Sequence, residues 1–546
     1  MIWIITGIIL GIIIILLTLN PKNRQNSKRY EMSSKAFHIY LIILFVCFAF
    51  VLLFEVTEIP VPFNVDEAGS AYDAISLVNH HTDRYLYRFP VYFVNFGGGQ
   101  NALYTYLAAI CIKIFGYSVL IVRLPAIIMS LLSALILTLT IRKVHGNTAS
   151  IIILFFFCIL PFSIMHSRWG LESYLLFPML IFSCAVLYYA VETRKPMAFF
   201  ISGVFLGCTL YAYTVAYILL PLFLCVICPY LLWIRKITWK NLLQLFLPLA
   251  VASLPLFLML AVNNGLINEI RTRFFSVPAF PFYRAHEVSF QNIIRHLMFD
   301  ENNVFYNLFV NDHCTYNIIP KFGSMYYITI PFILYGGFLC LIKSWKDIRR
   351  RTFSFDVMMS VLFVTAFGIC LMFEGINANR ACAVYFPLIY FLMLGTFETL
   401  KKSRNIALIF CIACISVFLF FIHYYFVDFP KVIERDSMFA SVTDIQKALV
   451  FADEINTREE TVYVLDSVQP YIYVLLSKQI DPYTFNEQKI LSNDHFVKVL
   501  GKYRFRLDVV LPECIYILNP ESQIQYDADF SGFNSKRFGS VAVFYQ

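Results

Sequence analysis

Apolar segments long enough to cross a lipid bilayer recur along this chain and leave few folds open to it. A membrane-spanning helix needs roughly 17–25 mostly apolar residues. Twelve segments meet this requirement, at residues 2–19, 37–57, 121–141, 149–166, 172–191, 198–214, 216–234, 241–262, 326–344, 355–373, 381–399 and 404–423. Hydrophobic residues make up 59% of the sequence and charged residues 14%, against about 45–50% and about 25% in soluble proteins. The sequence therefore predicts a polytopic α-helical membrane protein with about twelve transmembrane helices, and it excludes a soluble fold.

Lys and Arg are divided unevenly between the loops that join these segments. One alternating set carries 20 Lys or Arg in 55 residues, at 20–36, 142–148, 192–197, 235–240, 343–356 and 400–404. The opposite set carries 10 in 144 residues, at 58–120, 167–171, 211–216, 263–325 and 374–380. Because cytoplasmic loops hold the excess of positive charge, we expect the first set in the cytoplasm, and the second set and both termini on the extracytoplasmic side of a multi-pass cell-membrane protein. This topology also explains the net charge of +8, and no nucleic-acid partner is indicated.

Three regions follow from this reading. Residues 1–36 hold an additional N-terminal span and a basic cytoplasmic loop, and residues 37–426 form the main transmembrane module, with long outer loops at 58–120 and 263–325. Residues 427–546 change character, since they carry 12 Lys or Arg and 17 Asp or Glu. We expect this last region to form a small extracytoplasmic α/β domain.

Sequence patterns in the last region predict one helix followed by short strands. Residues 437–456 have the pattern of a helix. Strands are expected within 461–476, 505–511, 514–518 and 540–545, where β-branched and aromatic residues dominate. The region has no glycine-rich phosphate loop, zinc-site spacing or nucleophile elbow, so we expect the chemistry to lie in the transmembrane module.

Ionisable residues are costly near apolar spans, so the places where they gather indicate function. The first such place follows the second span, in the sequence NVDEAGSAYDA that contains Asp66 and Glu67. Adjacent side chains point in different directions, so one carboxylate could act as a general base and the other could bind a metal ion, a sugar or a neighbouring cation. The alternative is structural, with Asp66 capping a helix over residues 67–79 and Glu67 in its first turn.

A second group of residues surrounds the apolar segment 101–116. That segment is short and contains Lys113, so we predict an amphipathic helix in the outer membrane interface rather than a span. Three glycines, Gln100 and Asn101 precede it, and the glycines allow close approach of the backbone to a ligand or a tight turn. Arg123 begins the next span at its outer end, where it could bind a ligand or reach the lipid phosphates.

Two further clusters lie in short outer hairpins. His166, Arg168 and Glu172 fall within seven residues of the sequence MHSRWGLESY, and such a triplet is expensive unless it is paired or lines a water-filled cavity. Asn379 and Arg380 occur in the hairpin FEGINANRACAVYFP, where Arg380 is a candidate phosphate ligand. The structural alternatives are an Arg–Glu bridge in the first hairpin and an interfacial arginine in the second.

The shared side and the order of these clusters form a pattern. It comprises Asp66-Glu67, Phe115-Gly116, Arg123-Leu124-Pro125, Ser167-Arg168 with Glu172, and Asn379-Arg380. The pattern resembles the GT-C superfamily of membrane glycosyltransferases, within it the dolichyl-phosphate-mannose protein mannosyltransferase-like group and the related bacterial lipid A aminoarabinose transferases. The resemblance covers roughly residues 37–423. The chain departs from it in carrying an additional N-terminal span, and in having Gly98-Gly99-Gln100-Asn101 where many relatives carry a proline pair.

The resemblance implies an inverting glycosyltransferase that takes a sugar from a polyprenyl-phosphate donor in the membrane lipid, with or without the help of a divalent metal ion. The acceptor is a glycan, a lipid or a protein. Asp66 matches the position of the catalytic carboxylate, and Arg123 that of an arginine near the donor phosphate. The other expected substrate-binding residues are Glu67, Gln100, Asn101, His166, Arg168, Glu172, Asn379 and Arg380. Two alternatives remain open: a polytopic glycan polymerase or ligase, and a transporter of lipid-linked glycans.

Overall fold

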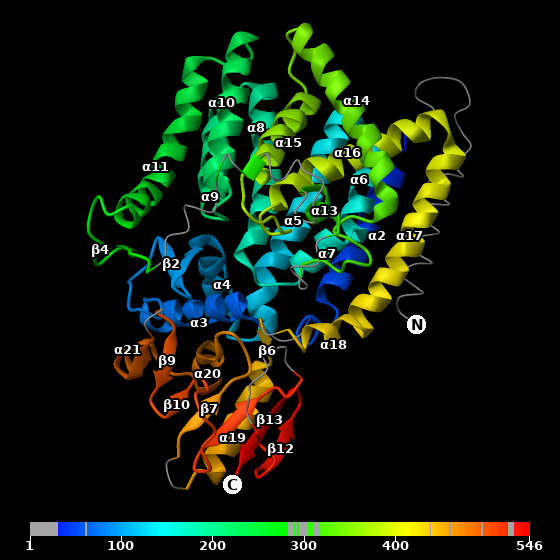
Figure 1. The fold of residues 1–546 in the computed structure, drawn as a ribbon. Helices are drawn as coiled ribbons and strands as arrows, with labels where there is room; N and C mark the ends of the chain where they lie inside the picture. The colour runs from blue at the N-terminus through cyan, green and yellow to red at the C-terminus, as the bar shows by residue number, and fades with distance from the viewer. Residues whose placement is uncertain are drawn as a thin grey trace.

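A computed structural model describes residues 31–60, 63–281, 289, 292–293, 304–310, 317–436, 438–457, 460–492, 495–521 and 529–546. The predicted N-terminal span at residues 2–19 lies outside these residues, as do His286, His296 and His313 of the long loop. The described part of the chain forms a helical bundle, a thin layer at one end of it, and a sheet domain beyond that layer (Figure 1).

The bundle consists of helices that follow the predicted spans in order. They are α2 (Ser34–Leu53), α5 (Val119–His145), α6 (Asn147–Ile159), α7 (Pro161–Ser167), α8 (Leu176–Thr193) with the preceding 3-10 turn η1 (Glu172–Leu175), α9 (Pro196–Leu210), α10 (Ala216–Trp233), α11 (Trp239–Asn263), α14 (Ile330–Arg349), α15 (Phe355–Cys370), α16 (Cys382–Lys402) and α17 (Arg404–Val427). In the described residues eight helical segments are long and apolar enough to cross a membrane, and the pair α6–α7, bent by 58°, would make a ninth.

The prediction of a polytopic helical membrane fold is confirmed, with two differences in length. The predicted spans 198–214 and 355–373 correspond to α9 and α15, of only 15 and 16 residues. Helix α9 ends at Leu210, and residues 211–215 form a non-helical connection to α10. A window of apolar residues cannot show where such a helix stops, because the residues beyond its end are equally apolar.

Helices α8 and α16 occupy the centre of the bundle, since most of each is buried inside the protein. Helix α16 packs against α14, α6, α15, α17 and α8. Its approach to α14 is close enough to require glycine: a Cβ added at Gly336 would lie 1.8 Å from the carbonyl oxygen of Phe391. The two backbones therefore touch where these helices cross.

A layer of short elements covers one end of the bundle. It contains β1 (Phe63–Asn64), α3 (Val65–His80), the hairpin of β2 (Tyr92–Asn95) and β3 (Gly98–Asn101), and α4 (Ala102–Phe115). Helix α4 is the helix predicted over 101–116, and it packs against α3 and α5. Figure 1 shows this layer between the bundle and the C-terminal domain.

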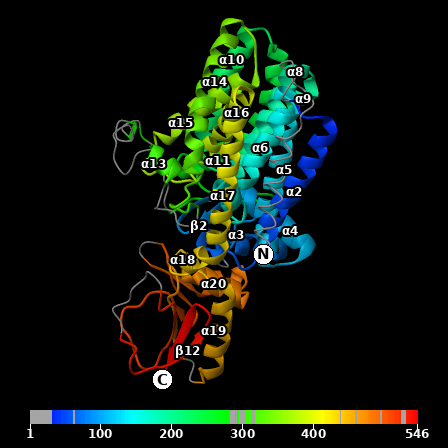
Figure 2. The ribbon, with the colours of Figure 1, turned by 90° about the vertical axis from the view of Figure 1, so that its right-hand side faces the viewer.

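The C-terminal domain is built on a seven-stranded mixed sheet. Its order is β12 (Asn534–Phe538), β13 (Val541–Tyr545), β11 (Ile515–Leu518), β7 (Val462–Val464), β10 (Tyr503–Arg504), β9 (Val497–Leu500) and β8 (Lys489–Leu491). Strand β7 runs parallel to β10 and β11, and the other pairs are antiparallel. Helices α19 (Val442–Ile455) and α20 (Pro470–Lys478) pack together beside the sheet (Figure 2). The expectation of an α/β domain is confirmed.

Two strand predictions in this domain are wrong. The apolar run at the end of 461–476 forms α20, which starts at Pro470 and is buried along nearly its whole length. A fully buried helix and a fully buried strand give the same apolar run, and periodicity does not separate them. Residues 505–511 form a loop rather than a strand.

Several contacts join the sheet domain to the layer above it, and some of them lie at the start of α3. Strand β6 (Phe439–Ala440), at the start of the domain, pairs antiparallel with β1. Helix α20 packs on α3, and the Tyr473 hydroxyl donates a hydrogen bond to the carbonyl oxygen of Phe63 at 3.1 Å. The C-terminal domain is thereby attached to the segment that leads directly into Asp66.

Candidate active site

The two adjacent carboxylates lie in the first turn of α3. This helix begins at Val65, and its cap is Asn64, whose side-chain oxygen accepts the backbone N–H of Asp66 at 2.9 Å. The structural alternative in which Asp66 itself caps the helix is therefore wrong. Asp66 is half-buried, whereas Glu67 has no exposed surface.

Both carboxylate oxygens of Glu67 belong to a buried ion pair with Arg123 of α5. The Arg123 Nε and Nη2 atoms donate to the two carboxylate oxygens at 2.7 and 2.9 Å. The backbone N–H of Gly170 donates to the same carboxylate at 2.7 Å, and neither member of the pair is exposed. Breaking such a pair is strongly unfavourable because it leaves a buried charge without compensation.

Arg123 and Arg168 also stabilise the carbonyl end of α2 and the turn that follows it. Arg123 Nη1 donates to the carbonyl oxygens of Val56 and Pro60 at 2.6 and 3.2 Å. Arg168, also without exposed surface, donates to four carbonyl oxygens, those of Val51, Leu52, Phe54 and Ile59. Helix ends leave their last carbonyls without partners, and cations there are favourable. The two arginines therefore stabilise the chain that leads from α2 to α3.

The β2–β3 hairpin brings amide N–H groups to two half-buried carboxylates, those of Asp66 and Glu172. Asn95 Nδ2 donates to Asp66 Oδ1 at 3.1 Å. The backbone N–H of Asn101 donates to Glu172, and the Asn101 side-chain oxygen accepts the hydroxyl of Tyr217 at 2.8 Å. Asp66 and Glu172 are close enough to interact electrostatically. Carboxylates from α3 and η1 thus bind the same hairpin and lie within electrostatic range of each other.

Three other predicted residues are placed as follows. Gln100 donates to the hydroxyl of Ser70 at 2.8 Å, one helical turn along α3 from Asp66. Asn379 accepts a hydrogen bond from Ser173 at 2.8 Å and so lies beside Glu172. Arg380 is half-buried and donates to the carbonyl oxygen of Gly375 at 2.7 Å.

His166 lies apart from this group. Its ring packs on Phe162, with ring centroids 4.3 Å apart, and on Tyr174. Its Nε2 atom is buried and has no hydrogen-bond partner in the described residues. The structure therefore brings Asp66, Gln100, Asn101, Glu172 and Asn379 into one neighbourhood and gives His166 an aromatic environment.

A divalent metal ion was expected as a possible cofactor. Oxygen-rich cation sites usually take several carboxylate and carbonyl ligands. Asp66 and Glu172 are two carboxylates, and in the described part of the chain no group of three or more His, Cys, Asp or Glu side chains gathers. This donor set does not make a complete cage, so no step proposed below passes through a metal.

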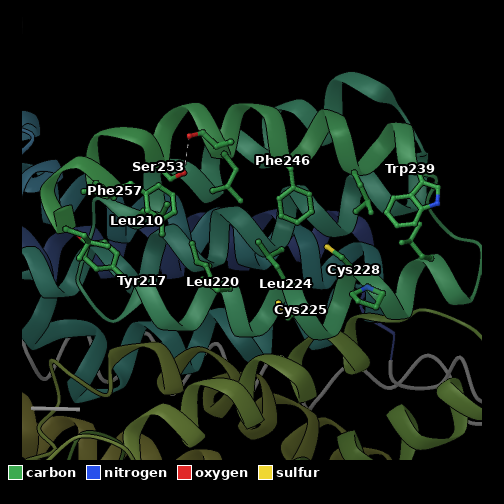
Figure 3. A pocket seen from close by; sticks show the side chains of 18 residues that line it. Leu210, Tyr217, Leu220, Leu224, Cys225, Cys228, Trp239, Phe246, Ser253 and Phe257 are labelled. Atoms are coloured by element: carbon green, nitrogen blue, oxygen red, sulfur yellow. Dashed lines mark hydrogen bonds between the residues drawn. The ribbon is translucent and has the colours of Figure 1, made fainter. Parts of the chain in front are cut away.

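An apolar groove between α10 and α11 begins beside the same hairpin. Its volume is about 640 Å³. Figure 3 shows Tyr217 and Phe257 at one end, Trp239 at the other, and Leu220, Leu224 and Cys225 between them. Tyr217 lines the groove and also binds Asn101, so one residue connects the groove to the carboxylates.

Comparison with known proteins defines the class. The family model described as dolichyl-phosphate-mannose-protein mannosyltransferase matches residues 101–262, from α4 into α11. The structure of ArnT from Cupriavidus metallidurans in the apo state has a TM-score of 0.54 and 13% identity, covering 93% of this chain and 98% of that one. ArnT bound to undecaprenyl phosphate has a TM-score of 0.53 and 12% identity, covering 92% and 97%. No curated protein matches this chain.

The fold is thus the fold of ArnT over nearly the whole length of both chains. The resemblance to the GT-C superfamily of membrane glycosyltransferases, predicted from the motifs, is confirmed. In sequence the match to the mannosyltransferase model is limited to residues 101–262, which contain Arg123, His166, Arg168 and Glu172.

Sequence reasoning missed two members of the site. Asn95 precedes the three glycines, and Tyr217 opens α10. A polar residue beside a glycine turn is a weak signal on its own, and a tyrosine at a helix end is common at a membrane interface. Only the pairing of β2 with β3 and the packing of α10 bring them to the carboxylates.

Proposed function

We propose that this protein is a membrane glycosyltransferase that moves a sugar from a polyprenyl-phosphate donor to an acceptor hydroxyl on the extracytoplasmic side of the membrane. The observation that carries the proposal is the position of Asp66: a half-buried carboxylate in a GT-C fold, bound by Asn95 and next to Glu172. Asp66 acts as the general base. Glu67 is unsuited to this role because its oxygens are occupied by Arg123 and Gly170.

The reaction is a single displacement at the anomeric carbon. The acceptor oxygen forms its bond to that carbon while the bond to the donor phosphate oxygen breaks, and the electron pair leaves with the phosphate. Asp66 takes the acceptor proton. Because the acceptor attacks the face opposite the phosphate, the anomeric configuration inverts. A positioned carboxylate base contributes about 10²–10⁴-fold to such a step.

The departing phosphate needs a cation, and Arg380 fits this role better than the other two arginines. Arg123 and Arg168 are buried and donate to Glu67 and to backbone carbonyls. Arg380 is half-buried, and its neighbour Asn379 contacts Ser173 beside Glu172. A guanidinium group held at the leaving oxygen stabilises the charge that develops there.

The groove between α10 and α11 suits the lipid part of the donor. Its lining is almost entirely aliphatic and aromatic, and it opens toward the carboxylates at Tyr217. A polyprenyl chain in this groove keeps its hydrocarbon tail between helices and holds its phosphate at the membrane surface. ArnT, which shares the fold, has been solved with undecaprenyl phosphate bound.

The arrangement of charge supports an extracytoplasmic site. The layer with Asp66 and the C-terminal domain lie at one end of the bundle (Figure 1). The loops between α10 and α11 and between α14 and α15, which contain Arg235, Lys236, Arg350 and Arg351, lie at the other end. Positive charge marks the cytoplasmic end, so the carboxylates face outward.

The proposal is tested by the stereochemistry of transfer. Purified protein in lipid is given a panel of polyprenyl-phosphate sugars of known anomeric configuration, with candidate glycan, lipid and peptide acceptors. NMR of the isolated product then gives the new anomeric configuration. We expect transfer from at least one donor, with inversion. Retention contradicts the single displacement, and absence of transfer from every donor contradicts the proposed function.

A further inference from the structure

We infer that Asn95 is the positioning residue for the base, and that its hydrogen bond holds the Asp66 carboxylate in the charged form. This inference rests on the proposed function. Asn95 lies on the second strand of the layer, outside every motif found in the sequence, and its amide nitrogen is 3.1 Å from Asp66 Oδ1.

The hairpin register explains why Asn95 reaches Asp66. Phe93 pairs with Gln100 and Asn95 with Gly98, so Asn95 and Gln100 lie on the same face of the hairpin, because directly paired residues and alternate residues share a face. These two amides contact Asp66 and Ser70, four residues apart on one face of α3. The hairpin therefore docks on the helix through two parallel amide contacts, and one of them ends on the base.

The orientation of the Asn95 amide follows from the chemistry of its partner. An ionised carboxylate only accepts hydrogen bonds, so the amide nitrogen faces Asp66 and the amide oxygen faces away. That oxygen, Oδ1, is buried and has no partner in the described residues. A buried oxygen without a hydrogen-bond partner is energetically unfavourable.

Gly69 provides the space in which the Asn95 side chain lies. A Cβ at Gly69 would be 2.8 Å from Asn95 Oδ1 and 2.7 Å from Arg84 Nη2. Arg84 cannot yield easily, because Asp73 binds its Nε and Nη2 atoms in a buried pair. A methyl group at position 69 is therefore expected to displace Asn95.

The consequence for Asp66 is electrostatic. A donor to the charged form of a carboxylate favours that form. The titratable groups that interact with Asp66 include Glu172 from η1. The adjacent Glu67 of α3 is paired with Arg123 of α5. Tyr473 of α20 also interacts with Asp66. The hydrogen bond from Asn95 thus favours the ionised form of Asp66, which is the form that can take the acceptor proton.

The test is the pH dependence of kcat/KM for sugar transfer. Removing the donor in Asn95→Ala should move the acidic limb upward by about 1 pH unit, which corresponds to one hydrogen bond to a charged group. Asn95→Asp has the same size and places a second carboxylate against Asp66, so it should move the limb further in the same direction. Gly69→Ala should move it in that direction as well.

Ser70→Ala is the matched control, because it removes the parallel contact to Gln100 and leaves Asn95 in place. Its acidic limb should coincide with that of the wild type. Thermal unfolding shows which variants are folded. If Asn95→Ala is not folded, Asn95→Asp is used for the test in its place. Asp66-dependent transfer with an unmoved limb in the folded Asn95 variants overturns this inference alone. No transfer by the wild type overturns the proposed function and the role of Asn95 with it.

Discussion

Asp66 and Glu67 are neighbours in the chain but have different surroundings. Helix α3 turns Glu67 inward to Arg123 and leaves Asp66 half-exposed beside Asn95 and Glu172. Adjacent positions on a helix point about 100° apart, and the docking of α3 against α5 then determines which carboxylate is paired. We therefore expect Glu67 to stabilise the fold, and we propose Asp66 as the residue that carries the chemistry.

The first prediction separates these two roles by stability. Glu67→Gln leaves the buried Arg123 without its counter-charge and should lower the free energy of unfolding by about 3–5 kcal/mol. Asp66→Asn removes a half-buried charge next to Glu172 and should change it by no more than about 0.5 kcal/mol. Unfolding in detergent or lipid measures both. Equal stability of the two variants would contradict the assignment.

The second prediction concerns Asp466, in the loop after β7. Burial, and to a smaller extent Asp444, raises the pKa of Asp466 to about 7, above the ordinary value of roughly 3.9 for an unfolded chain. The folded domain therefore binds more protons than the unfolded one between these values, and its stability falls as the pH rises through 7.

Asp466→Asn is the variant that checks this second prediction, since it is neutral at every pH. Hydrogen exchange of β7 and α20 should slow less steeply on acidification from pH 8 to pH 5 in the variant than in the wild type, after correction for intrinsic exchange. An identical pH dependence of protection in the two proteins would contradict the pKa assigned to Asp466.

Among the elements, the long helices were predictable, whereas several of the short elements were not. Helices α5, α11 and α17 are 24 or more residues long and mostly apolar, and no other structure accommodates such runs. The hairpin β2–β3 has strands of four residues, and its role depends on docking to α3. Helix α20 was predicted as a strand because it is apolar on all sides.

The same contrast holds for the site. Asp66, Glu172 and Asn379 could be predicted because polar residues are conspicuous beside apolar spans. The backbone partners of Arg123 and Arg168 could not be predicted, because the carbonyl groups of residues 51–60 become hydrogen-bond acceptors only when α2 ends there. Asn95 was missed for a related reason: its partner is set by the register of a short hairpin.

The third prediction tests the groove between α10 and α11. Cys225 is exposed and lines the groove, whereas Val226, the next residue of α10, is exposed outside it. Cys225→Trp should fill part of the groove and raise KM for a long-chain polyprenyl donor about tenfold, equivalent to about 1.4 kcal/mol. Val226→Trp is the control, because it places the same large side chain outside the groove.

Donor chain length sharpens this comparison. A water-soluble donor with a short isoprenoid should not need the groove, so Cys225→Trp should leave its KM close to the wild-type value. The assignment of the groove to the lipid tail fails if Cys225→Trp and Val226→Trp behave alike with the long-chain donor.

At the scale of the whole molecule, the C-terminal domain is attached to the candidate site. It pairs with β1, packs α20 on α3, and binds Phe63 through Tyr473. The pairing with β1 and the Tyr473 hydrogen bond lie within the three residues before Asp66, and α20 packs on α3 itself. The domain therefore stabilises the start of α3 from one side, while Arg123 and Arg168 stabilise the preceding turn from the other.

The fourth prediction concerns orientation in the membrane. Ser531 of the C-terminal domain and Lys240 at the start of α11 are both exposed and lie at opposite ends of the molecule. In intact cells a membrane-impermeant thiol reagent should label Ser531→Cys, whereas Lys240→Cys should react only after permeabilisation. Labelling is compared with the parent chain, which accounts for its native cysteines. The reverse pattern would contradict the extracytoplasmic site.

The most direct measurement of the central claim is the turnover of Asp66→Asn with the donor that the wild type uses. Asparagine has the size and shape of aspartate but accepts no proton. We therefore predict a loss of about 10³-fold or more in kcat, with donor binding unchanged. The exposed Glu58 provides the control, since Glu58→Gln should keep wild-type turnover. Turnover of Asp66→Asn within about threefold of the wild type would show that Asp66 is not the base, because loss of a general base is expected to lower the rate by far more.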